Sequence, residues 1–221
     1  MTGLTVAAGL LLILSSPAAC VAQLPAPGGF DDSVYCSHTG CIWVPFNSPR
    51  SFKRGDLTYT VKPDPVKDTG GSFVLSRHGK VLLQTQLSDL SASASVEWSD
   101  DNQSFAITWS SGGANGRFHL RVFHVDGDRV VEWPATQKAW PDFKARHWCG
   151  ARGDNIQAFG WMKNTSDLLL VLSVYPTRDC GSEMGYTEGF VVDASTGEIR
   201  NRWNRGQLSE YVRTHRELPS K

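Results

Sequence analysis

The sequence has 221 residues, in which 22 Lys and Arg balance 22 Asp and Glu, so the formal net charge at pH 7 is zero. Without a charge excess, nothing draws the chain to nucleic acid or to acidic membranes, and we expect neither as a partner. About 200 residues form one domain of ordinary size with a sizeable core. The 21 Gly and 8 Trp of this chain, together with its few helical patterns, favour β structure.

The N-terminus has the pattern of an export signal. An apolar run occupies residues 7–14 and mostly small residues fill 15–22, although the first six residues lack the usual Lys or Arg. The run is too short for a membrane span, which needs about 20 apolar residues. We therefore predict a signal peptide over 1–22, cleaved after Ala22, and a bacterial-type protein that is secreted or periplasmic; 221 − 22 leaves 199 residues.

A second cleavage position precedes Cys20, which would then carry a lipid anchor. Lipoprotein signals usually have Leu three residues before this Cys, where the chain has Pro17, so cleavage after Ala22 is preferred. The mature chain is expected to begin with a flexible lead-in over 23–33, rich in Pro and Gly, and to continue as a single β domain over 34–221.

Four cysteines remain after removal of the signal peptide, and an even number in an exported chain predicts two disulfides. Of the three connectivities, pairing nearest neighbours is preferred: Cys36–Cys41 and Cys149–Cys180. A zinc site is the alternative, because His38 lies between the first pair and His147 precedes Cys149. Oxidising conditions outside the cytoplasm favour disulfides, so no metal and no cofactor is expected.

Short apolar runs separated by turn residues are typical of an all-β chain. Alternate residues of one predicted strand are apolar and fall on one face: Phe105, Ile107 and Trp109. A second predicted strand shows the same alternation at Phe118, Leu120 and Val122. Residues 168–175 are apolar almost throughout, which predicts a central strand covered on both faces. Residues 77–80, with the sequence Arg-His-Gly-Lys, are a hairpin candidate.

The pattern repeats along the chain. Trp98 and Trp161 are each followed seven residues later by an apolar run, after a polar turn. A strand, a Gly-containing turn and a strand then end at Trp133 and at Trp203. Each unit, near 97–133 and 157–203, therefore predicts four short strands, and residues 73–83 form a fainter copy.

Four strands in about 40 residues is the size of a propeller blade. The segment Trp98-Ser-Asp-Asp-Asn-Gln-Ser-Phe-Ala-Ile resembles the opening of blades of the TolB and WD40 type. The chain also resembles secreted bacterial proteins that are built from such blade-like pieces. The resemblance implies a small or incomplete β-propeller, with a β-sandwich of four-strand sheets as the alternative, and it implies no activity. Residues 207–218 are the one helix candidate, expected to cover a sheet edge at the C-terminus.

No motif fixes a reaction, and we predict no catalytic residue. The chain has no Gly-x-Ser-x-Gly turn, and the Gly-rich residues 110–116 lack the Lys of a phosphate loop. The acidic residues do not form a spacing motif; Glu183, Glu188 and Asp193 only fall near one predicted strand. His119 and His124 should point to opposite faces of a strand, which argues against a joint metal site.

Two segments are candidates for binding. The first has aromatic residues interleaved with cations, and the second is the loop around Cys180; the candidate residues are Trp140, Arg146, His147, Trp148, Arg178 and Tyr186. Exposed Trp and Arg favour contacts with sugars or proteins. The alternative is that these aromatic side chains fill the core between two sheets.

The sequence therefore predicts an exported, non-catalytic binding or structural module of the cell envelope, whose partner is a protein or a glycan. The alternative is a secreted hydrolase that uses Asp, Glu or His on the loops at the strand ends. Two acidic groups with a clear spacing would favour the hydrolase, and the chain lacks them.

Overall fold

The computed structural model describes residues 41–42, 49–64, 69–91, 93–111, 117–149, 155–175 and 177–215. The predicted signal peptide, the lead-in and Cys36 lie outside the described residues, so the cleavage site, the lipid anchor and the Cys36–Cys41 pairing stay predictions. Among the described residues, no helix is long and apolar enough to cross a membrane.

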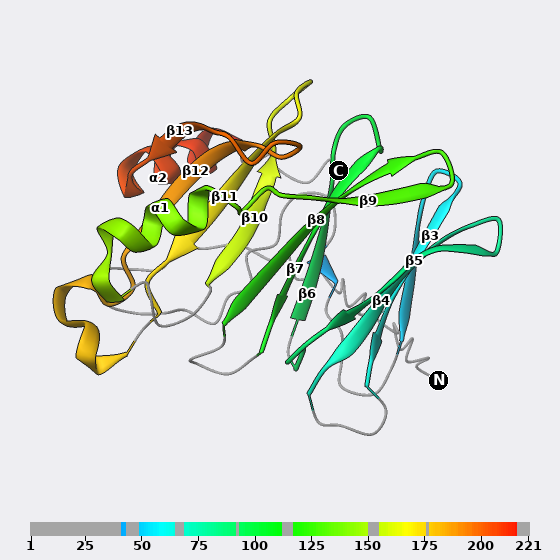
Figure 1. Ribbon diagram of the computed structural model, residues 1–221, viewed down its shortest axis with the longest axis horizontal. Helices are drawn as coiled ribbons and strands as arrows, with labels where there is room; N and C mark the ends of the chain where they lie inside the picture. Colours follow the sequence, from blue (N-terminus) through cyan, green and yellow to red (C-terminus); the bar gives the residue numbers. More distant parts are fainter. Residues whose placement is uncertain are drawn as a thin grey trace, which may run out of the picture.

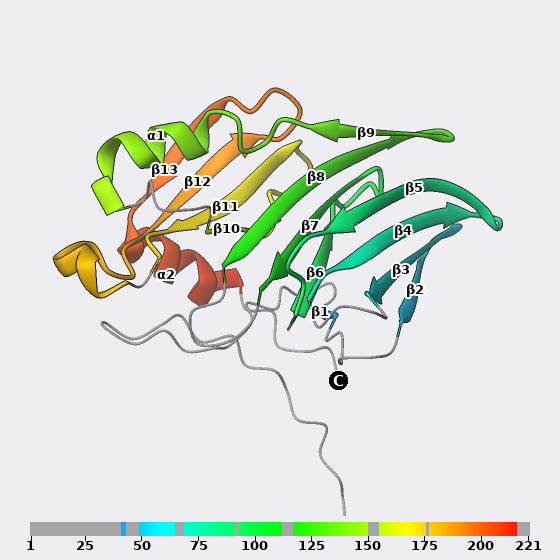
Figure 2. The same cartoon turned by 60° about the horizontal axis from the view of Figure 1, so that its bottom comes forward.

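The described strands form three antiparallel sheets (Figures 1 and 2). The first sheet consists of β2 (Arg50–Arg54), β3 (Leu57–Pro63), β4 (Gly71–Arg77) and β5 (Lys80–Leu87). The middle sheet consists of β1 (Cys41–Ile42), β6 (Ser93–Trp98), β7 (Ser104–Ser110), β8 (Phe118–Asp126) and β9 (Arg129–Trp133). The third sheet consists of β10 (Ile156–Trp161), β11 (Asp167–Ser173), β12 (Thr187–Asp193) and β13 (Ile199–Trp203).

Each sequence unit forms one sheet in which consecutive strands are neighbours. Trp98 ends β6 and Trp133 ends β9, just as Trp161 ends β10 and Trp203 ends β13. The all-β fold is therefore confirmed, with four strands in each unit. Kinship of these units with propeller blades stays a prediction, and the sandwich alternative is compatible with the same sheets.

The sheets stack face to face, with the middle sheet between the other two. Between the first and middle sheets, the ring of Phe73 lies 5.5 Å from that of Phe105, which lies 5.3 Å from that of Phe123. A second core between the middle and third sheets includes Ala106, Leu168 and Leu170. Burial of these apolar faces is the main force that holds the stack together.

Equivalent turns of consecutive sheets touch one another. Lys80, at the β4–β5 turn, forms a 2.7 Å ion pair with Asp128 at the β8–β9 turn. The turns between the first and second strands of the two repeated units also meet: the Asn164 backbone N–H of the β10–β11 turn donates to Asp100 of the β6–β7 turn over 3.4 Å. The repeated units are therefore stacked in the same orientation, turn beside equivalent turn.

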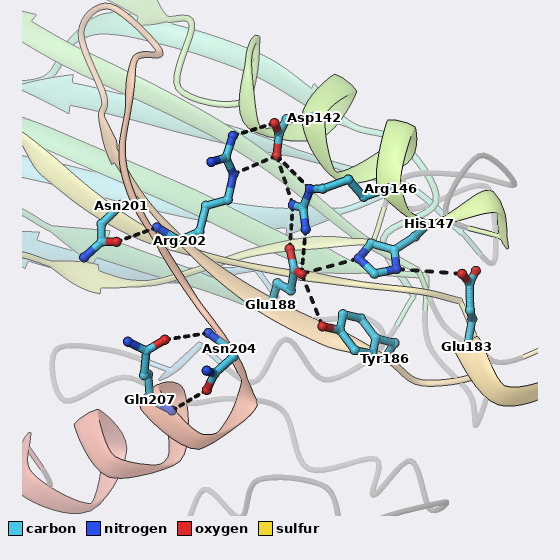
Figure 3. Close-up of polar contacts among 10 residues, drawn as sticks. All are labelled: Asp142, Arg146, His147, Glu183, Tyr186, Glu188, Asn201, Arg202, Asn204 and Gln207. Atoms are coloured by element: carbon cyan, nitrogen blue, oxygen red, sulfur yellow. Dashed lines mark hydrogen bonds and ion pairs between the residues drawn. The ribbon is translucent and has the colours of Figure 1, made fainter.

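The C-terminal helix α2 (Arg205–His215) covers the outward face of the third sheet and not a sheet edge as predicted, because Leu208 packs against Leu169 and Val171. β11 is consequently buried on both faces, as predicted. The helix begins before the predicted Gln207, because Asn204 and Gln207 form a capping box (Figure 3). The Gln207 N–H donates to Asn204 Oδ1 over 3.0 Å, and the Asn204 N–H donates to Gln207 Oε1 over 2.9 Å.

Candidate functional site

A second helix, α1 (Ala139–Arg146), lies between the middle and third sheets in the chain and was not predicted. It packs Phe143 against Phe190 of β12, on the face of the third sheet that also meets the middle sheet. Pro141 argues against a helix in the sequence, because proline lacks a backbone N–H. In the structure it lies in the first turn of α1, where the missing N–H breaks no helical hydrogen bond. This helix carries four of the predicted binding residues on or directly after it.

A disulfide connects the end of α1 to the loop before β12. Cys149 and Cys180 are bonded with their Cα atoms 5.5 Å apart, which confirms the predicted pairing. Both cysteines are buried. Cys180 belongs to the short 3-10 segment η2 (Arg178–Glu183), so the disulfide brings the two predicted binding segments side by side.

Arg146, the last residue of α1, is the centre of an ion-pair network (Figure 3). Its Nη1 and Nη2 donate to the two oxygens of Glu188 over 2.7 and 2.6 Å. Its Nη2 and Nε donate to Asp142, one turn earlier on the helix, over 2.9 and 3.3 Å. Both edges of the guanidinium are thus occupied by carboxylates of the same chain.

Asp142 also joins α1 to the edge strand β13. Arg202 donates from Nε and Nη2 to the two oxygens of Asp142, over 2.9 and 2.6 Å. The hydrogen bonds from Arg202, then those from Arg146 together with both charges, outweigh the desolvation of Asp142 and lower its pKa below the ordinary value. Asp142 is therefore a fixed anion that holds two cations.

His147 follows α1 and is held between two rings and two carboxylates. Its ring centroid lies 4.6 Å from that of Phe143 and 4.4 Å from that of Tyr186. Nε2 lies 3.4 Å from Glu188, and Nδ1 lies 3.9 Å from Glu183. Only 12% of the side chain is exposed, so His147 supports the loop rather than reaching into solvent.

The carboxylate of Glu188 is fully engaged. Burial alone raises its pKa, but the hydrogen bonds and charge of Arg146, with His147, reverse this and lower the pKa below the ordinary value. The Tyr186 hydroxyl also donates to Glu188, over 3.2 Å. Burial, followed by the Glu188 charge, raises the pKa of Tyr186. The Glu188 carboxylate is therefore held in its charged form at neutral pH.

Around this network, three large apolar side chains face the solvent. Trp148 is 60% exposed, Met184 is 43% exposed and Tyr186 is 40% exposed. They lie on the two segments that the disulfide joins, and the His147–Tyr186 contact brings those segments together. We call Trp148, Met184 and Tyr186 the disulfide surface.

The structure separates the predicted binding residues into groups. Arg146, His147 and Tyr186 meet at Glu188, and Trp148 is exposed beside them. Trp140 is half-buried against the core, with its ring 5.9 Å from Phe143 and Lys144 5.4 Å above it. Arg178 begins η2, and its side chain lies outside the described residues.

Sequence reasoning missed the partners that organise the site. Asp142 and Arg202 were not singled out, and Glu183 and Glu188 were considered as acidic residues without partners. The one available signal was the spacing of Asp142 and Arg146, which is that of an ion pair on a helix. It had no meaning until α1 was known to be a helix.

Two further arrangements bear on catalysis. Ser104 Oγ lies 3.0 Å from His124 Nδ1, which is a nucleophile–base distance, but Ser104 is only 4% exposed. A substrate would not reach this hydroxyl. No group of three or more His, Cys, Asp or Glu side chains suited to a metal ion occurs within the described ranges.

The chain was compared with protein-family models, with curated proteins and with solved structures. None of the three comparisons gives a match, so the site has to be interpreted from its own geometry.

Proposed function

We propose that the protein is an exported, non-catalytic binding module of the cell envelope, which contacts its partner through the disulfide surface. The observation that carries the proposal is the 60% exposure of Trp148 on a segment fixed by a buried disulfide. Exposed Trp and Tyr side chains on a rigid support are typical anchors of binding surfaces, because they bury much area at little cost in entropy.

The ion pairs make this surface rigid before a partner arrives. Arg146, Asp142, Glu188 and Arg202 tie α1, β12 and β13 together, and His147 fills the space beneath Tyr186. A surface held in its binding conformation loses less conformational entropy on association. The network therefore fits a supporting role for the exposed side chains.

The same network argues against the hydrolase alternative. A glycosidase needs one carboxylic acid whose pKa is raised, opposite a second free carboxylate. Here the pKa of Glu188 is lowered and its oxygens are held by Arg146. The nearest serine–histidine pair, Ser104 and His124, is closed to substrate because the serine is buried.

Export is supported by two independent features of the chain. The predicted signal peptide directs the protein out of the cytoplasm. The Cys149–Cys180 disulfide forms and persists under oxidising conditions. A partner in the cell envelope, whether protein or glycan, is therefore the one that this surface would meet.

Site-specific photo-crosslinking tests the proposal. A benzophenone amino acid is placed at Trp148 and, as a control, at Val131, which is 40% exposed on β9 of the middle sheet. In cells that export the protein, we expect a discrete crosslinked product from position 148 and none from 131. Equal crosslinking at both positions would remove the disulfide surface as the contact site.

A screen for activity tests the alternative. Purified protein is incubated with ester and glycan substrates, and Glu188→Gln serves as the matched variant. We expect no turnover by either protein. Turnover that disappears in Glu188→Gln would replace the binding module with a hydrolase.

A further inference from the structure

The first sheet has an uneven charge that the neutral composition of the chain hides. Its four strands, RSFKR, LTYTVKP, GSFVLSR and KVLLQTQL, contain six Lys or Arg and no Asp or Glu. The middle and third sheets both contain acidic residues in their strands, among them Glu97, Glu132, Asp167 and Glu188. The strands of the first sheet are therefore positively charged, while Asp56, Asp64 and Asp89 lie outside them in its turns and connections.

Strand alternation separates the two faces of this sheet. Tyr59, Phe73 and Leu75 point into the core shared with the middle sheet. The opposite face carries hydroxyl, amide and ammonium groups beside the apolar Val74; the six polar residues used here are Lys53, Thr60, Lys62, Ser72, Gln84 and Gln86. We call these six residues the polar face. It forms the end of the stack that α2 does not cover (Figure 2).

The corresponding face of the other two sheets is apolar. Phe105 of β7 packs toward the first sheet, and Leu168, its equivalent in β11, packs toward the middle sheet. In the first sheet, β3 instead places Thr60 and Lys62 on the matching side. The chain thus replaces a packing surface with a hydrogen-bonding surface where the stack ends.

The cations of the polar face are not neutralised within the described part of the protein. Lys53 and Lys62 are exposed, and neither forms an ion pair or a side-chain hydrogen bond with another described residue. By contrast, Arg77 and Lys80 of the same sheet pair with Asp56 and Asp128. No other described residue therefore uses the charges of Lys53 and Lys62, and both are exposed to an external anion.

Of the neighbouring polar side chains, Thr60 shares a 2.7 Å hydrogen bond with Ser51, and three others have no partner among the described residues. Ser72, Gln84 and Gln86 have no side-chain partner in the described ranges, and Gln84 and Gln86 are exposed. Hydroxyl and amide groups both donate and accept, as sugar hydroxyls do. Across the strands these groups repeat about every 4.8 Å, which makes a flat array rather than a pocket.

We propose that the polar face binds an acidic polysaccharide, with Lys53 and Lys62 binding its carboxylate groups and the hydroxyl and amide side chains binding its hydroxyls. Charge complementarity selects a polyanion. The face lacks the large aromatic anchors of a protein interface and the aromatic platforms on which bases stack in single-stranded nucleic acid. Among polyanions, the hydroxyl and amide groups favour a glycan.

Retention of the purified protein on immobilised polygalacturonate tests the proposal, with uncharged dextran as the control matrix. We expect Lys53→Gln/Lys62→Gln to bind polygalacturonate roughly tenfold more weakly than the unchanged protein, because two exposed ion pairs are lost. Lys53→Arg/Lys62→Arg keeps the charge and should keep binding. Salt should weaken binding because the contacts are ionic.

The matched control is Arg129→Gln/Lys163→Gln, which removes the same charge from exposed positions in other sheets that also have no ion pair within the described ranges. We expect it to bind as the unchanged protein does. An equal loss in both double variants, no binding to polygalacturonate, or equal retention on dextran would overturn the proposal. Tighter, lysine-dependent binding to an oligothymidylate would overturn the assignment to a glycan. Trp148→Ala should leave this binding unchanged, so the two proposed surfaces fail separately.

Discussion

Arg146 and Glu188 are 42 positions apart in the sequence, and the guanidinium of the first binds the carboxylate of the second through parallel hydrogen bonds of 2.7 and 2.6 Å. The side chain of Glu188 is 11% exposed and that of Arg146 is 38% exposed. A pair of this kind joins the end of α1 to the start of β12. It also occupies both oxygens of the Glu188 carboxylate.

Removal of the Arg146 charge should destabilise the protein. Arg146→Met leaves Glu188 and Asp142 without their shared cation, and we expect a loss of about 2 kcal/mol in the free energy of unfolding. Urea denaturation followed by circular dichroism measures this. Arg129→Met, at an exposed position without an ion pair in the described ranges, is the matched control. A loss no larger than that of the control would mean that the network adds nothing to stability.

Acid should weaken the fold through the same carboxylates. The pKa values of Asp142 and Glu188 are lowered in the folded protein, so both bind protons more readily when the chain is unfolded. Their contribution is complete above the unfolded-state pKa of about 4 and is lost as pH falls through the lower folded-state values. Unfolding midpoints should therefore change little between pH 7 and 5 and drop below pH 4.

Asp142→Asn provides the control for this dependence. Since the variant cannot take up a proton at this position, its stability should fall less steeply below pH 4 than that of the unchanged protein. Parallel curves for the two proteins would contradict the assignment of Asp142 as an acid-sensitive contact.

The disulfide should stabilise the fold by restricting the unfolded chain. Cys149 and Cys180 are 31 residues apart, and closing a loop of this length contributes about 3.5 kcal/mol in the chain-entropy model. Cys149→Ser/Cys180→Ser should lose about that free energy of unfolding. An unchanged midpoint would show that the fold does not depend on this bond.

Peptide mapping of the unreduced protein would show whether Cys36 pairs with Cys41.

Two tryptophans of the predicted binding segment should respond differently to truncation. Trp140→Ala removes a half-buried ring that packs on Phe143, and we expect a loss of about 2 kcal/mol. Trp148→Ala removes a ring that is 60% exposed and should change stability by less than about 0.5 kcal/mol. Thermal unfolding of both variants distinguishes them. A large loss in Trp148→Ala would make that ring part of the core and remove it from the disulfide surface.

The sequence by itself predicted the strands of the two repeated units and one disulfide, but not β2 and β3 of the first sheet. Alternation around Phe105 and the repeated tryptophans at 98 and 161 are local patterns, because a strand alternates its side chains every second residue wherever it lies. The pairing of Cys149 with Cys180 could also be predicted from positions in the sequence, because a shorter loop is easier to close.

Only the tertiary structure showed which residues of the two candidate segments meet one another and which are exposed. Asp142 meets Arg202 across 60 positions, and Arg146 meets Glu188 across 42, because the stacking of the sheets places α1 over β12 and β13. The exposure of Trp148 and the burial of Trp140 have the same origin. The sequence alone does not show which residues become neighbours. Sheet packing determines this, because it buries some faces and leaves others exposed to solvent.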